Sequence, residues 1–217
     1  YQYNPRLIAA ARAIERGTIY DRRGLPLATS RHQELLPFAA RYRRLGLDVA
    51  SACSDERTRC YPLGGLAFHV LGESVNQTNW AARNTSFVEE DFDATLKGFD
   101  DRPHATDVRN PRTGRVSAVI RRDYADLLPL VRHKRDLAHP DVQQLLSRDR
   151  DVHLTLDAGL QVMAARALRR RVESAASGGG AAVVLDSNSG ELLASASYPW
   201  PDFARGASNE TDLAPIA

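Results

Sequence analysis

The sequence contains no run of about 20 apolar residues, the length that a membrane-spanning helix needs, and no signal-peptide pattern at its start. It also has little excess charge: 29 basic residues stand against 27 acidic ones. Such a balance gives no strong attraction to nucleic acid or to an acidic polymer, so we predict no nucleic-acid partner. Lysine is scarce too: Lys97 and Lys134 are the only lysines, and all other basic residues in this count are arginines. Because the chain opens on Tyr1 rather than methionine, we expect a piece of a longer protein.

Cysteine is almost absent, and the only two residues of this type are Cys53 and Cys60. Two interpretations stay open: a short-loop disulfide formed in an oxidising compartment, or two unpaired thiols. A zinc site needs about four ligands, and His69 is the only histidine close to this pair in the sequence. We therefore predict no metal site and no cofactor.

The composition is that of an ordinary globular protein, with 43% hydrophobic and 26% charged residues over 217 positions. The length fits one or two domains of roughly 100–200 residues. In the first part of the chain, residues 18–20 and 25–28 flank a turn at 21–24 and predict a hairpin, with Pro26 in an edge strand. Residues 35–47 are weakly helical, and 66–71 form a short apolar run that helices also allow.

Further along, Val88, Phe92 and Leu96 recur at helical spacing and predict an amphipathic helix over 87–96, ended by Gly98. Residues 100–114 indicate a loop and 116–120 a strand, while 124–150 is charged and irregular and is the best candidate for a domain boundary.

Beyond residue 151 the pattern becomes regular. Residues 152–156 predict a strand, and Asp157 is a good N-cap for a helix. That helix has one apolar stripe, formed by Leu160, Ala164, Leu168 and Val172, with Met163 and Ala167 beside it. Strands over 181–186 and 191–197 flank a tight turn and predict a second hairpin.

Five segments, in order, resemble motifs of the class B penicillin-binding proteins. They are residues 16–28 (R-G-x-I-x-D-R-x-G-x-x-L-A), 59–72, 89–98, 154–161 and 181–199. Together they cover most of the chain, although 100–150 contains no segment of this kind. The residues that carry the resemblance, and that we take as candidate site residues, are Arg16, Gly17, Asp21, Arg22, Gly24, Arg59, Tyr61, Pro62, Gly64, His69, Gly72, Glu89, Phe92, Asp93, Gly98, Asp157 and Gln161.

The resemblance implies an α+β architecture in two parts. Residues 1–150 would form an elongated, mostly-β dimerisation or pedestal domain with short helices. Residues 151–217 would be the beginning of a transpeptidase domain, a strand–helix–hairpin fragment. It further implies a membrane-anchored, extracytoplasmic parent that cross-links peptidoglycan, with a cell-wall polymerase and other elongation or division proteins as partners. Formation of a homodimer is left open.

The residues needed for that chemistry are missing from the sequence. The family's nucleophile motif, S-x-x-K, has no counterpart, because Ala94 and Val131 stand three residues before the two lysines. The S-x-N and K-T-G motifs are absent as well. We therefore expect a non-catalytic chain, since nothing in it can form the acyl-enzyme. The alternative is a free-standing, degenerate interaction protein of the same machinery; a hydrolase assembled from His69, Ser195 and Asp186 is the weakest interpretation.

The charged candidates have two interpretations. Arg16, Asp21 and Arg22 would bind a partner or glycan, or they would form an ion network that pins the first hairpin, which we favour. Glu89 is the expected carboxylate partner of one of these arginines. His69 lies in an apolar run and is expected to be a satisfied core histidine rather than a ligand or base.

Overall fold

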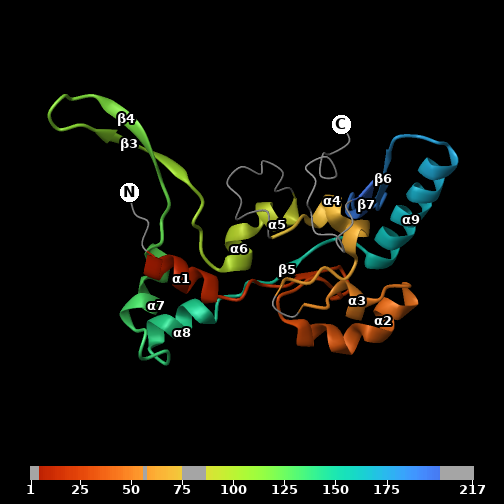
Figure 1. The fold of residues 1–217 in the computed structure, drawn as a ribbon, viewed down its shortest axis with the longest axis horizontal. Helices are drawn as coiled ribbons and strands as arrows, with labels where there is room; N and C mark the ends of the chain where they lie inside the picture. Colours follow the sequence, from red (N-terminus) through yellow and green to blue (C-terminus); the bar gives the residue numbers. More distant parts are fainter. Residues whose placement is uncertain (1–4, 56–57, 75–86, 201–217) are drawn as a thin grey trace. The chain divides into compact units, whose positions relative to one another are not determined.

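The computed structural model describes residues 5–55, 58–74 and 87–200, where helices mix with small sheets (Figure 1). This confirms the predicted α+β class. The chain divides into two compact units, each made of separated stretches. The first combines residues up to Arg16 with 94–150, and the second combines 17–93 with 151 onward. Within the described residues, no helix has both the length and the apolarity needed to cross a membrane.

The first unit is mainly helical and carries one hairpin, in which β3 pairs antiparallel with β4 from His104 opposite Arg121 to Arg109 opposite Val116. Its small core contains Leu7, Phe99, Leu127 and Leu145. The hairpin extends away from the helices of this unit (Figure 1). The elements are α1 (Pro5–Ala13), most of α6 (Asp93–Lys97), β3 (His104–Arg109), β4 (Val116–Arg121), the 3₁₀ helix η4 (Ala125–Leu127), α7 (Leu128–Arg132) and α8 (Pro140–Leu146).

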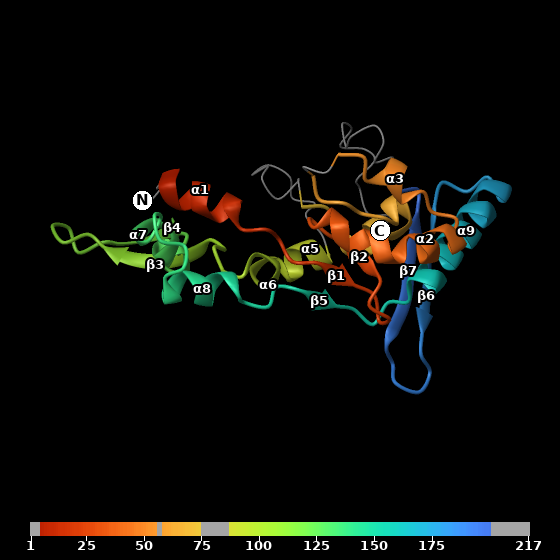
Figure 2. The same ribbon diagram turned by 90° about the horizontal axis from the view of Figure 1, so that it is seen from below.

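The second unit contains a three-stranded sheet in the order β2-β1-β5 and a separate hairpin, β6–β7. The sheet joins distant parts of the chain, because β1 pairs antiparallel with β2 and parallel with β5. Figure 2 shows β6 and β7 side by side next to α9. Its elements are β1 (Ile19–Tyr20), β2 (Pro26–Ala28), η1 (His32–Phe38), α2 (Ala39–Arg44), α3 (Val49–Ala52), η2 (Gly64–Ala67), α4 (Phe68–Leu71), α5 (Val88–Asp91), β5 (Val152–His153), α9 (Ala158–Ser174), β6 (Gly180–Leu185) and β7 (Leu192–Tyr198).

Several local predictions are confirmed: both hairpins, the edge position of Pro26, the helical segments within 35–47 and 66–71, the strand at 116–120 and the helix that begins after Asp157. Three predictions for the first 150 residues are wrong. Residues 104–109 form strand β3 rather than loop, 124–150 holds α7 and α8 rather than irregular chain, and helix exceeds strand over this part. The patterns misled because β3 is largely solvent-exposed, and because helices of five to seven residues show too few turns of periodicity.

The predicted helix over 87–96 is two short helices, α5 and α6, which meet at Phe92. Phe92 is 42% exposed, so it does not continue the buried stripe that Leu96 belongs to. The predicted end of the second helix is confirmed. Gly98 has φ +79° and its N–H donates to the carbonyls of Ala94 and Thr95, a backbone conformation that glycine adopts without a Cβ penalty.

The buried face of α9 is also displaced from the predicted stripe. The buried positions of the helix are Ala158, Gln161, Val162, Ala165 and Val172, whereas Met163 is 62% exposed. This face packs against β7, where Ala194 and Ala196 are fully or almost fully buried. A Cβ on Gly180 would come within 3.1 Å of Leu168 and Val172 side chains, so β6 also lies close to the helix.

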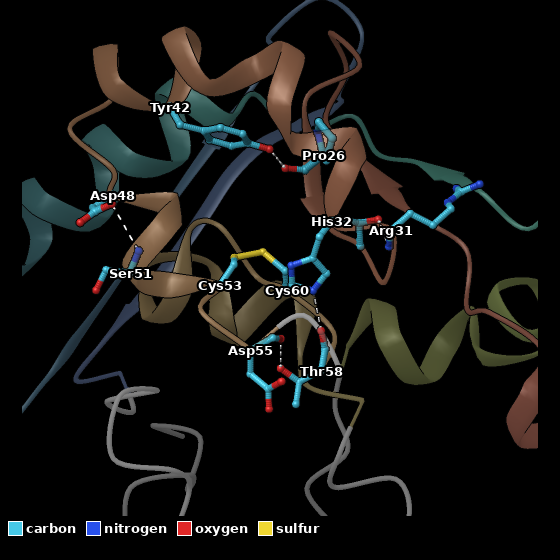
Figure 3. Close-up of a disulfide and its surroundings, with 11 residues drawn as sticks. Pro26, Arg31, His32, Tyr42, Asp48, Ser51, Cys53, Asp55, Thr58 and Cys60 are labelled. Atoms are coloured by element: carbon cyan, nitrogen blue, oxygen red, sulfur yellow. Dashed lines mark hydrogen bonds between the residues drawn. A yellow bond between two sulfur atoms is a disulfide. The ribbon is translucent and has the colours of Figure 1, made fainter.

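Cys53 and Cys60 form a disulfide with a Cα–Cα distance of 5.1 Å (Figure 3), which decides between the two interpretations left open above. Cys60 is buried and its backbone pairs with Thr29 beyond the end of β2. The bond therefore ties α3 to the hairpin region. Nearby, the His32 Nε2 lies 2.8 Å from the carbonyl oxygen of Thr58.

Reduction of this disulfide is expected to lower the free energy of unfolding by about 2–3 kcal/mol, because it opens a loop whose two ends are seven positions apart in the sequence. Denaturant unfolding with and without a phosphine reductant measures the loss. The double variant Cys53→Ser/Cys60→Ser should unfold like the reduced protein and ignore the reductant. Equal stability of the oxidised and reduced forms, with two free thiols confirmed by mass, would contradict the prediction.

Candidate functional site

The candidate site is built around the carboxylate of Asp21, which is 1% exposed at the turn of the first hairpin. Its Oδ1 accepts the backbone N–H groups of Arg23 at 2.8 Å and Leu25 at 2.7 Å. The N–H of Gly24 donates to the Asp21 carbonyl, and its φ of +71° is the left-handed conformation that favours glycine. The sequence D-x-x-G therefore encodes this turn, because the aspartate satisfies the N–H groups that the turn leaves unpaired.

The same carboxylate joins the hairpin to the start of α9. Oδ2 of Asp21 accepts the N–H of Ala158 at 3.3 Å, and the Arg22 N–H donates to the Leu156 carbonyl at 2.9 Å. Arg23 adds an ion pair to Asp157, whose Oδ1 in turn caps α9. Segments 16–28 and 154–161 thus meet through backbone and carboxylate bonds, next to the parallel pair β1 and β5.

Gln161 of α9 bonds two further segments through its amide, although it is only 1% exposed. Its Nε2 donates to the carbonyls of Leu66 and Ser195, each at 2.8 Å, and its Oε1 accepts the Ser195 N–H at 2.9 Å. A buried amide is stable only when its donors and acceptor are paired, and here all of these bonds go to backbone groups. Gln161 therefore holds the segment 59–72 and strand β7 against α9.

A buried ion pair joins the remaining segment, 89–98. The Nε of Arg59 donates to Oε1 of Glu89, and the two side chains are 3% and 0% exposed. The Tyr61 hydroxyl also donates to Oε1, at 3.2 Å, and accepts the Ser74 N–H at 2.8 Å. Burial and then the Glu89 charge raise the pKa of Tyr61, so its hydroxyl stays protonated and remains a donor.

The predicted ion network is confirmed in part, with different partners. Glu89 bonds Arg59, an arginine that the sequence prediction did not choose for it. Arg22 pairs with Glu191 at 3.1 Å, but both side chains are more than one third exposed. Arg16 belongs to the other unit, and its pairing with Glu89 stays a prediction.

His69 is half-buried rather than a core residue. Its Nε2 lies 3.1 Å from the Pro199 carbonyl oxygen, and its ring makes edge contacts with Phe68 and Phe87. Asp186, placed with it in the weakest interpretation, accepts the N–H groups of Asn188 and Ser189, and these bonds lower its pKa. Within the described residues, no hydrogen bond joins a serine or threonine hydroxyl to a histidine ring.

Sequence analysis missed a second polar cluster, which lies at the start of β1 around Thr18, whereas Asp21 follows the end of this strand. Thr18 Oγ1 donates to Glu34 Oε2 at 2.7 Å, and Arg31 forms ion pairs with Glu34 at 2.8 Å and Asp151 at 2.6 Å. The Thr18 N–H donates to Asp151 as well, at 2.7 Å. The one available signal was charge complementarity between Arg31 and Glu34 at spacing i, i+3; nothing local points to Asp151.

The other candidate residues shape the backbone or lie at the edge of the unit. Gly17 and Pro62 are buried, and Gly64 and Gly72 have positive φ in the turn after Tyr61 and at the end of α4. Asp93 begins α6 and is half-buried, and Phe92 is exposed. Neither group points to a binding pocket.

The arrangement as a whole, which we call the motif junction, consists of Asp21, Arg59, Glu89, Asp157 and Gln161 with the backbone groups they bond. Besides the ion pairs and the hydroxyls of Tyr61 and Ser30, it bonds backbone N–H and carbonyl groups. Together these bonds join the five segments to one another.

No protein-family model matches the chain, and no curated protein matches it. Among solved structures, the penicillin-binding protein PBP2 from Helicobacter pylori is similar to it with 16% sequence identity and a TM-score of 0.40. The match covers 86% of this chain and 43% of the Helicobacter protein, so the chain spans less than half of that protein's length.

Proposed function

We propose that this chain is the non-catalytic, amino-terminal part of a class B penicillin-binding protein, a pedestal that positions a transpeptidase domain and binds other cell-wall proteins. The observation that carries the proposal is the motif junction. All five segments chosen from the sequence for their resemblance to this family contribute residues to one compact unit, where buried contacts made by the resembling residues join them. A chance resemblance would give no reason for Asp21, Glu89 and Gln161 to be buried and paired.

The second support is the outer face of β6. Along this strand the exposed positions are Ala181, Val183 and Leu185, and the two larger side chains are 60% and 59% exposed. A two-stranded hairpin is marginally stable alone, and an apolar face of this kind is normally covered. In a complete transpeptidase domain, further polypeptide packed on this face would cover it. The disulfide fits the proposed extracytoplasmic location, because such bonds persist in oxidising compartments.

The proposal is tested in cells by exporting the chain on a cleavable signal peptide. A pedestal that binds cell-wall polymerases or division proteins should compete with the resident protein, so incorporation of a fluorescent D-amino acid into the wall should fall and cell shape should change. The same chain kept in the cytoplasm is the control. Growth, shape and labelling unchanged by an exported, folded chain would contradict the pedestal role.

The non-catalytic part of the proposal has its own test. The chain should not react with a fluorescent penicillin, because the sequence has no S-x-x-K motif to supply the acylated serine. Intact-protein mass spectrometry measures this directly. A stoichiometric adduct with the mass of one penicilloyl group would show that the chain is an enzyme after all.

A further inference from the structure

Three potential metal ligands gather where α7 ends and α8 begins, in the unit that does not contain the motif junction. They are His133, which follows α7, and His139 and Asp141, which flank the first residue of α8. One ligand atom from each lies within 4.8 Å of the other two. We propose that these three side chains bind one divalent transition-metal ion, with Zn²⁺ as the reference case. Sequence analysis predicted no metal site, because it considered only the surroundings of the cysteines.

The backbone holds these positions close before any ion arrives. The His133 N–H donates to the Pro129 carbonyl, and the His133 carbonyl accepts the Asp136 N–H at 2.8 Å. On the other side, Val142 and Leu145 of α8 are 0% and 3% exposed, which anchors the helix that carries Asp141. Both ends of the short connection are therefore fixed, and binding requires side-chain rotation only.

The two imidazole rings are stacked, with centroids 3.5 Å apart and planes 13° apart, so one ring must rotate out of the stack before both nitrogen lone pairs can point at one ion. Nδ1 of His139 lies 3.8 Å from Oδ2 of Asp141 and accepts the Asp141 N–H over a long 3.3 Å contact. In a tetrahedral zinc site, with metal–ligand distances of about 2.0–2.2 Å, neighbouring ligand atoms stand about 3.3 Å apart. The observed atoms thus need to approach by about 1.5 Å at most. The interactions given up are the ring stack and the long bond from the Asp141 N–H.

The donor set decides the class of ion. Two imidazole nitrogens and one carboxylate suit Zn²⁺, Ni²⁺ or Cu²⁺, whereas Ca²⁺ and Mg²⁺ prefer oxygen ligands throughout. His133 and His139 are half-buried and Asp141 is exposed, so the site is open to solvent and water can complete the coordination. A bound ion would join the end of α7 to the start of α8.

The test is calorimetric titration of the intact, untagged chain with ZnCl₂. We expect one saturable site per chain, weakened at least about tenfold in His133→Ala and in Asp141→Asn. His104→Ala is the matched control, because His104 is exposed in the same unit but lies on β3, outside the cluster, and this variant should bind as the parent does. Circular dichroism verifies that each variant folds.

A second readout locates the ion without relying on affinity. In ¹⁵N-correlated spectra of the imidazole rings, Zn²⁺ should shift the signals of His133 and His139 and leave His104 unchanged. The proposal is overturned if Zn²⁺ binding does not saturate, if His133→Ala and Asp141→Asn bind as the parent does, or if His104→Ala weakens binding equally. Because the cluster is separate from the motif junction, none of these results bears on the proposed pedestal function.

Discussion

Replacing Glu89 with alanine is expected to lower the free energy of unfolding by about 3–5 kcal/mol, the usual cost of removing one member of a buried ion pair. The loss is large because Arg59 stays behind with its charge in a site where its side chain is only 3% exposed. The Tyr61 hydroxyl loses its acceptor in the same variant. Urea unfolding followed by circular dichroism measures the change.

Glu191→Ala is the matched control for this variant. Glu191 is also paired with an arginine, Arg22, but both side chains are more than one third exposed, so its loss should cost under about 1 kcal/mol. The double variant Arg59→Met/Glu89→Leu should recover much of the stability lost in Glu89→Ala, because it leaves no unpaired charge. If Glu89→Ala and Glu191→Ala were equally mild, Glu89 would not be the buried partner described here.

Replacing Asp21 with alanine should cost about 2–4 kcal/mol and loosen the first turn of α9. The variant removes the acceptor of three backbone N–H groups, those of Arg23, Leu25 and Ala158, and a buried donor left unpaired costs about 1–3 kcal/mol. Hydrogen exchange should therefore quicken at the Ala158 amide as well as in the turn. That remote effect distinguishes a junction from a purely local turn.

Asp186→Ala tests whether the burial of Asp21 is the reason for the large loss of stability expected in Asp21→Ala. Asp186 also accepts two turn N–H groups, from Asn188 and Ser189, but on the exposed turn of the β6–β7 hairpin, where water can replace the acceptor. Its loss should therefore cost much less than the loss of Asp21. An Asp21 variant with unchanged exchange at Ala158 would mean that the 3.3 Å contact to α9 contributes nothing to holding the segments together.

Local structure was predictable where the cause is local. Each of three local features depends on residues within four positions of the backbone they stabilise: the D-x-x-G turn, the cap at Asp157 and the glycine that ends α6. The pairing of β1 with β5 was not predictable, since each strand has two residues and the partners lie far apart in sequence. The buried face of α9 was predicted wrongly for a related reason. Its hydropathy predicts that Gln161 is exposed, but backbone groups of segments distant in sequence bond its amide and allow its burial.

The candidate site was predicted better as a list of residues than as a set of contacts. Residues chosen by resemblance, such as Asp21, Glu89 and Gln161, are buried and bonded. Their partners follow from the fold, so the assignment of Glu89 to Arg59 needed the structure. The division into residues 1–150 and 151–217 stays a prediction, and the compact units draw their residues from both parts.

The parallel pairing of β1 with β5 has a consequence for synthesis on the ribosome. The Thr18 N–H donates to Asp151, which lies 133 positions further along the chain. At roughly 5–20 residues per second, the first hairpin therefore waits about 7–27 s for its partner to emerge. During that interval the open edge of β1 is free to pair with another chain. The nascent polypeptide is thus most vulnerable to misassembly before Asp151 is made, and a chaperone that binds extended segments would protect it then.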